Sequence, residues 1–112
     1  MYDCIIIGAG PAGLTAGIYA SRAGLKTLIL EKETIGGQIS SSPLVENYPG
    51  FTKISGAELS NNMYDQAISS GAELEIETVE EIIDGTIKIV KTDDSVYKTK
   101  TIIIGIIISI LF

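Results

Sequence analysis

Hydrophobic side chains near the start of the chain first form a continuous run and then recur at helical spacing. Residues 2–7 are apolar at all but one position and end in three isoleucines, which is typical of a strand buried on both faces of a parallel sheet. Residues 11–23 predict a helix, because Pro11 suits its first turn and Gly24 suits the left-handed position after its end. A second apolar strand is predicted at 27–30. The first thirty residues therefore predict a βαβ unit.

The first predicted helix has a stripe of very small side chains along one face. These residues recur three and four positions apart: Gly13, Ala16, Gly17 and Ala20. Side chains at this spacing share one face of a helix. We therefore expect the backbone of this helix to lie close to the neighbouring strands.

The next part of the chain predicts a long loop followed by a second helix. Residues 31–52 follow no period and are rich in glycine, serine and proline, and a loop of this length is usually functional or mobile. Ser55 as N-cap and Glu58 form a capping-box pattern, so a helix is expected from there to about Ser70. Its predicted buried face consists of Leu59, Met63, Ala67 and Ile68.

The remaining sequence alternates short apolar runs with turn signals. Asp84-Gly85 is favoured in two-residue hairpins, and Asp93-Asp94 predicts a second turn. We expect a weaker strand at 74–79, an antiparallel meander of strands at 82–84, 86–90 and 96–98, and a buried strand at 102–104 that returns to the first sheet. Five acidic residues are expected to form the solvated face of this region: Glu73, Glu75, Glu77, Glu80 and Glu81.

These elements together predict an α/β fold. The expected architecture is a Rossmann-like, three-layer unit with a parallel sheet, helices and an antiparallel β-meander. The chain has 112 residues, of which 46% are hydrophobic. This is enough apolar material for one core and too little length for two typical domains.

The charge of the chain restricts its partners. Eight basic and fourteen acidic residues give a net charge of -6, whereas nucleic acid or an anionic membrane requires a basic face. The apolar stretch 102–112 would be only about 16 Å long as a helix, which is too short to cross a bilayer. We therefore expect no nucleic acid and no membrane as partners. The absence of a basic segment after Met1, together with a single cysteine, favours a cytoplasmic location.

Cys4 is the single cysteine, and the chain contains no histidine. A cysteine inside an apolar strand is usually a small buried hydrophobe. With no second thiol and no imidazole, the sequence predicts no redox-active dithiol and no transition-metal site. We accordingly expect no catalytic residue in this chain alone.

The strongest chemical signal is the glycine-rich segment between the first predicted strand and helix, Gly8-Ala9-Gly10-Pro11-Ala12-Gly13. In this context Gly8 permits a tight turn, Gly10 leaves room for a pyrophosphate, and Gly13 lets helix and strand pack closely. The N–H groups and dipole at the helix N-terminus then favour the anion. Glu31 ends the second strand at the distance where this motif places an acid on an unphosphorylated ribose.

A simpler interpretation is that these glycines only form a turn and that Glu31 is a solvated strand end. The strand, the helix, the small-residue stripe and the acid nevertheless occur together, in the order that a dinucleotide-binding unit requires. Dinucleotide binding is therefore the preferred prediction.

Further segments indicate which dinucleotide is bound, through a resemblance. Three segments resemble the low-molecular-weight thioredoxin reductases, which are FAD-dependent pyridine nucleotide-disulfide oxidoreductases: Gly36-Gly37-Gln38, Val45-Glu46-Asn47-Tyr48-Pro49-Gly50-Phe51 and Gly56-Ala57-Glu58-Leu59. The resemblance extends to about Ile104. It implies FAD rather than NAD, with Gly37 and Gln38 near the pyrophosphate and ribityl chain, Asn47 near the flavin, and the backbone of Val79 at the adenine.

For the side chains of Gln38 and Asn47, ordinary capping of the loop by an amide is an equal alternative. The complete set of expected cofactor-binding residues is Gly8, Ala9, Gly10, Pro11, Ala12, Gly13, Glu31, Lys32, Gly36, Gly37, Gln38, Asn47 and Val79.

The resemblance also implies steps of electron transfer for which this sequence lacks the required motifs. The family passes electrons from NADPH through FAD to a Cys-x-x-Cys pair and then to a thioredoxin-like protein, and it allows for a homodimer. This chain has no second dinucleotide motif for NADPH and no second cysteine. We expect residues 1–104 to be the N-terminal half of an FAD-binding domain, an incomplete domain that is inactive alone.

The resemblance ends abruptly after the last predicted strand. The family carries Ala-Thr-Gly at this point, whereas this sequence continues Gly105-Ile106-Ile107. We expect residues 105–112 to be an aberrant hydrophobic tail produced by a truncated or frameshifted reading frame.

Two alternatives remain open. A related flavoenzyme, such as a ferredoxin-NADP reductase of similar architecture or the flavoprotein partner of a peroxiredoxin, would share the GAGPAG and Gly-Gly-Gln segments. A non-enzymatic nucleotide-binding module would bind ADP or FAD without flavin redox chemistry.

Overall fold

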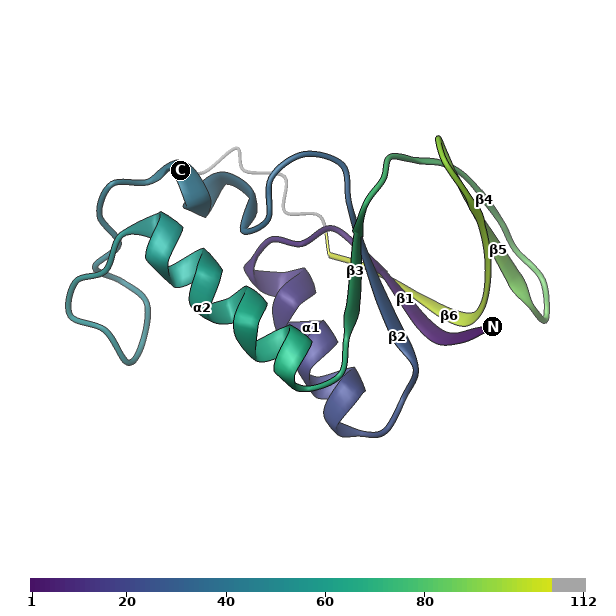
Figure 1. Cartoon of the computed structure of the whole chain (residues 1–112), viewed down its shortest axis with the longest axis horizontal. Helices are drawn as coiled ribbons and strands as arrows, with labels where there is room; N and C mark the ends of the chain where they lie inside the picture. The colour runs from purple at the N-terminus through teal and green to yellow at the C-terminus, as the bar shows by residue number, and fades with distance from the viewer. Residues whose placement is uncertain (106–112) are drawn as a thin grey trace.

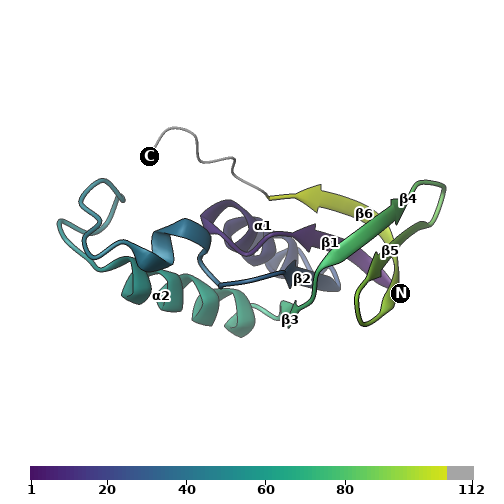
Figure 2. The same ribbon diagram turned by 90° about the horizontal axis from the view of Figure 1, so that it is seen from above.

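Six strands form one continuous sheet, and two helices pack on one of its faces (Figures 1 and 2). The computed structural model describes residues 1–105, so the expected tail lies outside the described residues apart from Gly105. The elements in chain order are β1 (Tyr2–Ile7), α1 (Pro11–Arg22), β2 (Thr27–Glu31), the 3-10 helix η1 (Gly37–Ser41), α2 (Gly56–Ser69), β3 (Glu73–Ile76), β4 (Val79–Ile83), β5 (Lys88–Thr92) and β6 (Val96–Ile104). No helix among these residues is both long and apolar enough to cross a membrane.

The strand order is β3-β2-β1-β6-β5-β4. The first four strands of this order run parallel, and β5 and β4 continue the sheet as an antiparallel hairpin. The predicted βαβ unit is confirmed, because β1 and β2 pair in parallel with Ile5 opposite Leu28. The predicted α/β fold, with a parallel sheet, helices and a meander, is therefore the observed one.

The prediction of two separate strands at 96–98 and 102–104 was wrong, because both belong to β6. Polar residues interrupt the apolar pattern here but remain extended, since Thr99 pairs with Tyr2 of β1 on one side and with Lys88 of β5 on the other. Thr99 is fully buried, and its hydroxyl donates to the carbonyl of Thr101 at 3.0 Å. One strand therefore joins the parallel and antiparallel parts of the sheet.

The C-terminal end of β6 is less buried than its sequence predicts. Ile103 is 41% exposed and Ile104 is 64% exposed. Beyond Thr99, β1 is the only described strand that pairs with β6. An apolar pattern typical of a central strand therefore lies at an open edge among residues 1–105.

The predicted strand at 74–79 was also wrong, because it is divided between β3 and β4. These two strands lie at opposite ends of the strand order but are joined by only Glu77 and Thr78. Five steps between neighbouring strands would place them about 24 Å apart in a flat sheet, whereas the connection reaches about 11 Å. The sheet must therefore curl, and Figure 1 shows β4 and β5 folded back on the side opposite the helices.

The hairpin turn between β4 and β5 is wider than two residues. The last pair of the ladder is Ile83 with Ile89, and Gly85 within the turn has a φ of 155°. The expected Asp84-Gly85 turn thus forms part of a longer connection. The second expected turn, at Asp93-Asp94, does separate β5 from β6.

Helix α2 begins as predicted, because the hydroxyl of Ser55 accepts a hydrogen bond from the N–H of Glu58 at 3.1 Å. Its expected buried residues Leu59, Met63 and Ala67 are buried, but Ile68 is 39% exposed. Ile68 follows Ala67 and is rotated by about 100° around the helix axis. Ser60, which was not predicted to be buried, lies on the buried face instead.

Glu77 was wrongly predicted to be solvated, since only 8% of it is exposed. Its carboxylate accepts hydrogen bonds from the hydroxyls of Thr92 and Tyr97, both at 2.6 Å. The N–H of the adjacent Thr78 donates to the side-chain carboxylate of Asp93, and the N–H of Asp93 donates to the carbonyl of Thr78, both at 3.0 Å. These bonds attach the short crossing between β3 and β4 to the turn after β5.

This cluster predicts a pH dependence of stability at alkaline pH. Burial and the hydrogen bond to Glu77 raise the pKa of Tyr97 to about 12, from an ordinary value of 10.0. The folded state holds this proton more tightly, so the contribution to stability is complete below about pH 10 and is lost as the pH rises to about 12. We expect the unfolding free energy, measured by urea titration, to fall over this range less steeply in Tyr97→Phe than in the unmodified chain.

The control is Tyr19→Phe, because Tyr19 is 69% exposed and belongs to α1. This variant should keep the slope of the unmodified chain. An unchanged slope in Tyr97→Phe would contradict the assigned role of the phenol.

Candidate nucleotide-binding site

The first glycine loop connects β1 to α1 at the C-terminal edge of the parallel strands. Gly8 has a φ of 105°, and its N–H donates to the carbonyl of Leu30 at 2.8 Å. Gly10 is the N-cap of α1, with no side-chain cap, and Pro11 opens the helix as predicted. The N–H groups of the first helical turn have no carbonyl of their own helix to bond. They are therefore available to an anion, which the helix dipole also favours.

Two glycines of this loop differ in what surrounds them. A Cβ added to Gly13 would overlap the carbonyl oxygen of Gly8, so the predicted close packing of helix and loop requires a glycine there. A Cβ added to Gly10 would meet nothing within 4 Å. Gly10 therefore borders open space, which is where the motif expects a pyrophosphate.

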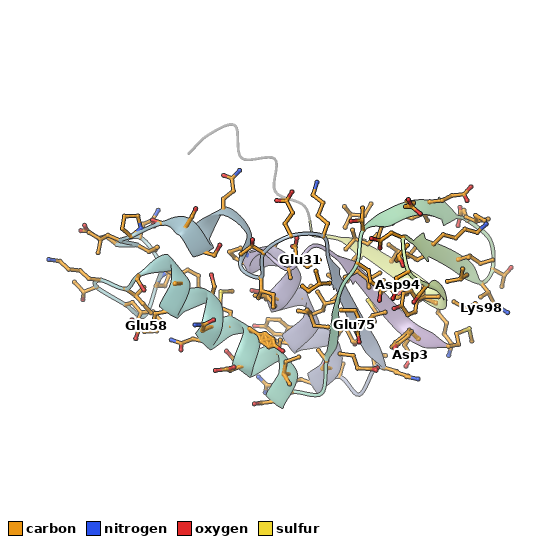
Figure 3. All side chains as sticks on the ribbon, turned by 45° about the horizontal axis from the view of Figure 1, so that its top comes forward. Asp3, Glu31, Glu58, Glu75, Asp94 and Lys98 are labelled. Carbon is orange, nitrogen blue, oxygen red and sulfur yellow. The ribbon has the colours of Figure 1, made fainter. Side chains whose placement is uncertain are left out.

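Glu31 lies midway along the molecule, between η1 and the β4–β5 hairpin (Figure 3). Its Oε1 accepts a hydrogen bond from the N–H of Ala9, and its Oε2 accepts one from the N–H of Glu33, both at 2.9 Å. A carboxylate offers about four lone-pair sites, so each oxygen can still accept a ribose hydroxyl. The bond to Ala9 also shows that Glu31 supports the glycine loop itself, which spacing alone did not predict.

The second glycine segment is brought directly against the first. The N–H of Gly36 donates to the carbonyl of Ala9 at 2.6 Å. A Cβ added to Gly37 would lie 3.5 Å from the Cα of Gly10. Gly36 and Gly37 have φ angles of 93° and 61°, a left-handed conformation that favours glycine. Two loops separated by more than twenty residues therefore form one surface.

Helix η1 was not predicted within this long loop. The signal that could have found it is the pair of serine hydroxyls, since Ser40 and Ser41 each donate to the carbonyl three residues earlier, at 2.6 and 3.0 Å. Gln38 lies on the exposed side of η1, and Lys32 is likewise exposed at the end of β2.

The two outermost predicted residues lie on either side of these loops. Val79 begins β4, and two residues before it the N–H of Glu77 donates to the carbonyl of Glu31 at 2.9 Å. Asn47 is exposed in a loop closed by a bridge between Val45 and Ile54, and residues 46–52 of that loop surround a shallow hollow of about 420 Å³. Figure 1 shows the loop of residues 43–53 beyond α2, on the opposite side of the glycine loops from β4.

The amide side chains of Gln38 and Asn47 form no hydrogen bond with another residue of the described chain. Cys4 is 2% exposed and packs in the core between sheet and helices. Among residues 1–105, no three side chains of His, Cys, Asp or Glu are grouped as metal ligands would be.

Comparison with known proteins agrees with this geometry. Residues 2–106 match the model of the family described as pyridine nucleotide-disulphide oxidoreductase. The chain is 50% identical over 106 residues to the thioredoxin reductase of Bacillus subtilis (strain 168), an alignment that covers 94% of this chain and 34% of that protein. The chain therefore spans about a third of the length of the relatives it matches.

Solved structures give the same result. The thioredoxin reductase of Lactococcus lactis, in its FR conformation, superposes with a TM-score of 0.89 at 44% identity and covers 93% of this chain and 35% of its own. A ferredoxin-flavin thioredoxin reductase from Clostridium acetobutylicum superposes with a TM-score of 0.80 at 28% identity, over 92% of this chain and 36% of its own. The fold described here corresponds to one part of these larger chains.

The contrast between Gly13 and Gly10 predicts opposite effects of the same substitution. Gly13→Ala places a methyl group on a backbone carbonyl that cannot move aside, so we expect it to lower the unfolding free energy by about 3 kcal/mol, the upper end of overpacking costs. Gly10 has an extended backbone conformation and open space around its Cα, so Gly10→Ala should lower the unfolding free energy by less than about 1 kcal/mol. Urea unfolding without ligand measures both, and equal losses would contradict the assigned roles.

Proposed function

The chain belongs to the pyridine nucleotide-disulphide oxidoreductase family, and we propose that it binds FAD through its two glycine loops, as the flavin-binding part of a thioredoxin-reductase-like flavoprotein. The observation that carries this proposal is the contact between the loops. Gly37 lies against Gly10, the hydrogen bond from Gly36 to Ala9 holds them together, and the space beside Gly10 is open. A pyrophosphate placed there would face the free N–H groups of α1.

The adenosine end of the ligand would lie on the side of β2. Glu31 is held by two backbone N–H groups and retains lone pairs for the two ribose hydroxyls. A 2′-phosphate would add negative charge beside this carboxylate, so an unphosphorylated ribose is favoured. The backbone that leads from Glu77 to Val79 borders the same region through its bond to the carbonyl of Glu31.

The flavin end would extend in the opposite direction along the molecule. Gln38 on η1 and Asn47 in the loop beyond α2 are exposed, and their amides are not engaged by the described residues. Amide side chains both donate and accept hydrogen bonds, which suits the ribityl chain and the polar edge of a flavin. Bound FAD would supply the redox chemistry, and the residues of this chain would bind and orient it.

The rest of the proposed pathway needs groups beyond those in this chain. Electron transfer from NADPH to a disulfide such as that of a thioredoxin-like protein requires a nicotinamide site and a dithiol, but this sequence has one cysteine and one glycine motif of the dinucleotide type. We propose that the chain acts as one part of this cytoplasmic system and is inactive alone.

A ferredoxin-dependent flavoprotein is the second candidate. It is favoured by the superposition on the Clostridium acetobutylicum protein, which is named a ferredoxin-flavin thioredoxin reductase. The two candidates share the binding of FAD proposed here and differ in the electron donor.

Titration of the purified chain with FAD, followed by quenching of flavin fluorescence, tests the proposal. We expect saturable binding that ADP competes and that 2′-phospho-ADP competes less well, because of Glu31. Gly10→Ala should weaken FAD binding by at least about tenfold, because the methyl group occupies the pyrophosphate space, while the ligand-free chain loses less than about 1 kcal/mol of stability. Ser69→Ala, at the exposed end of α2, should bind as the unmodified chain does. Absence of saturable quenching would refute the proposal.

The proposed inactivity has its own test. The chain, loaded with FAD and supplied with NADPH and oxidised thioredoxin, is expected to show no NADPH oxidation above that of free FAD, because it offers no dithiol. Adding a complete thioredoxin reductase to the same cuvette is the positive control. Steady turnover by the chain alone would contradict this expectation.

A further inference from the structure

Helix α2 contacts the second glycine segment at two positions where only very small residues fit. A Cβ added to Gly36 would overlap both the Cβ and the Oγ of Ser60. One helical turn earlier, a Cβ added to Gly56 would overlap the carbonyl oxygen of Ile39, and the N–H of Gly56 donates to the carbonyl of Ser42 at 2.8 Å. At these two positions the segment 36–42 rests directly on the first turns of α2, with no space for a methyl group on either glycine.

The side chain of Ser60 is unusual for a polar residue. It is 3% exposed, and its hydroxyl has no hydrogen-bond partner among the described residues. Leaving a buried hydroxyl unpaired is unfavourable, so hydrogen bonding does not explain its place on the buried face. Its size does, because Gly36 lies immediately above it.

The position of Gly36 in turn determines the distance between the two glycine loops. Its N–H donates to the carbonyl of Ala9, and Gly37 follows it at the Cα of Gly10. A displacement of Gly36 away from α2 would therefore press Gly36 and Gly37 against the first glycine loop. Ser60 lies against Gly36 and is not among the neighbours of Gly10 or Gly37, the two glycines beside the proposed pyrophosphate space, yet it supports the segment that bounds this space.

We propose that Ser60 is a positioning residue, whose small side chain sets the separation of the two glycine loops and thereby the affinity for the dinucleotide. This inference deepens the proposed function and rests on it for the ligand. The effect on the loop itself is independent of any ligand, because it concerns the hydrogen bond from Gly36 to Ala9.

The test compares Ser60→Val with Ala67→Val. Ala67 is fully buried on the same helix, two turns farther from η1, so both substitutions enlarge a buried α2 side chain but only the first lies under Gly36. Hydrogen exchange of the Gly36 amide in the ligand-free chain is measured relative to that of Ile29, a core amide that reports general loss of stability. FAD affinity is measured on the same samples by fluorescence quenching. Ser60→Ala, which adds no volume, and Ser60→Cys, a milder enlargement, complete the series.

We expect Ser60→Val to accelerate exchange of the Gly36 amide about tenfold relative to Ile29 and to weaken FAD binding by a similar factor. Ser60→Cys should do both to a smaller degree, and it decides the matter where Ser60→Val does not fold. Ser60→Ala and Ala67→Val should leave the exchange ratio and the affinity within about twofold.

Three results separate the possibilities. Normal protection of Gly36 in a folded Ser60→Val or Ser60→Cys variant would overturn the positioning role, as would an equal effect of Ala67→Val. Accelerated exchange with unchanged FAD affinity would overturn the link to the ligand. If the unmodified chain does not bind FAD, the proposed function fails, while the exchange measurements still decide whether Ser60 positions the loop.

Discussion

The two backbone hydrogen bonds of Ala9 hold together the loops that form the candidate nucleotide-binding site. The N–H of Ala9 donates to the carboxylate of Glu31, its carbonyl accepts from the N–H of Gly36, and its methyl group is fully buried. One residue thus joins β1, the end of β2 and the second glycine loop. The two hydrogen bonds and the burial of the methyl group are all supplied by the protein itself, so no ligand is needed to hold the loop against β2 and the second glycine loop. Ordering a binding surface in advance reduces the entropy lost on association.

The second constraint is the two-residue crossing between β3 and β4. It forces the sheet to curl, which places the β4–β5 hairpin over the face of β1 and β2 that the helices do not cover, and a second core forms between them. The buried carboxylate of Glu77 holds this crossing through the hydroxyls of Thr92 and Tyr97. The N–H of the same residue bonds the carbonyl of Glu31. The curl of the sheet and the adenosine side of the proposed site are therefore coupled through one residue.

Features encoded by neighbouring residues were predictable from the sequence, and features that depend on distant contacts were not. The turn at Gly8, the start of α1 at Pro11 and the cap at Ser55 follow from local chemistry, and the structure has all three. The burial of Glu77 depends on hydroxyls 15 and 20 residues away, which no local pattern reveals.

The same distinction explains the errors in the second half of the sheet. Thr99 interrupts an apolar pattern, and local rules divide the strand there, but pairing with strands on both sides keeps it extended. Ile103 and Ile104 have the composition of a central strand, and their burial depends on which neighbours are present rather than on composition. Of the candidate site, the glycines and Glu31 could be proposed from the sequence because their expected roles belong to a motif. Ser60 could not, because a small polar residue on a helix face becomes informative only once Gly36 is seen above it.

The two ends of the proposed site differ in how much of it is formed in advance. At the adenosine end, Glu31 is oriented by two backbone hydrogen bonds and the loops are held together by a third. At the flavin end, Gln38 and Asn47 are exposed side chains without partners in the described chain, so their rotamers must be ordered when a ligand binds. Each immobilised long side chain costs about 0.5–1.5 kcal/mol. The affinity of this chain for a flavin dinucleotide should therefore reside mainly in the ADP half, where the fold has already fixed the geometry.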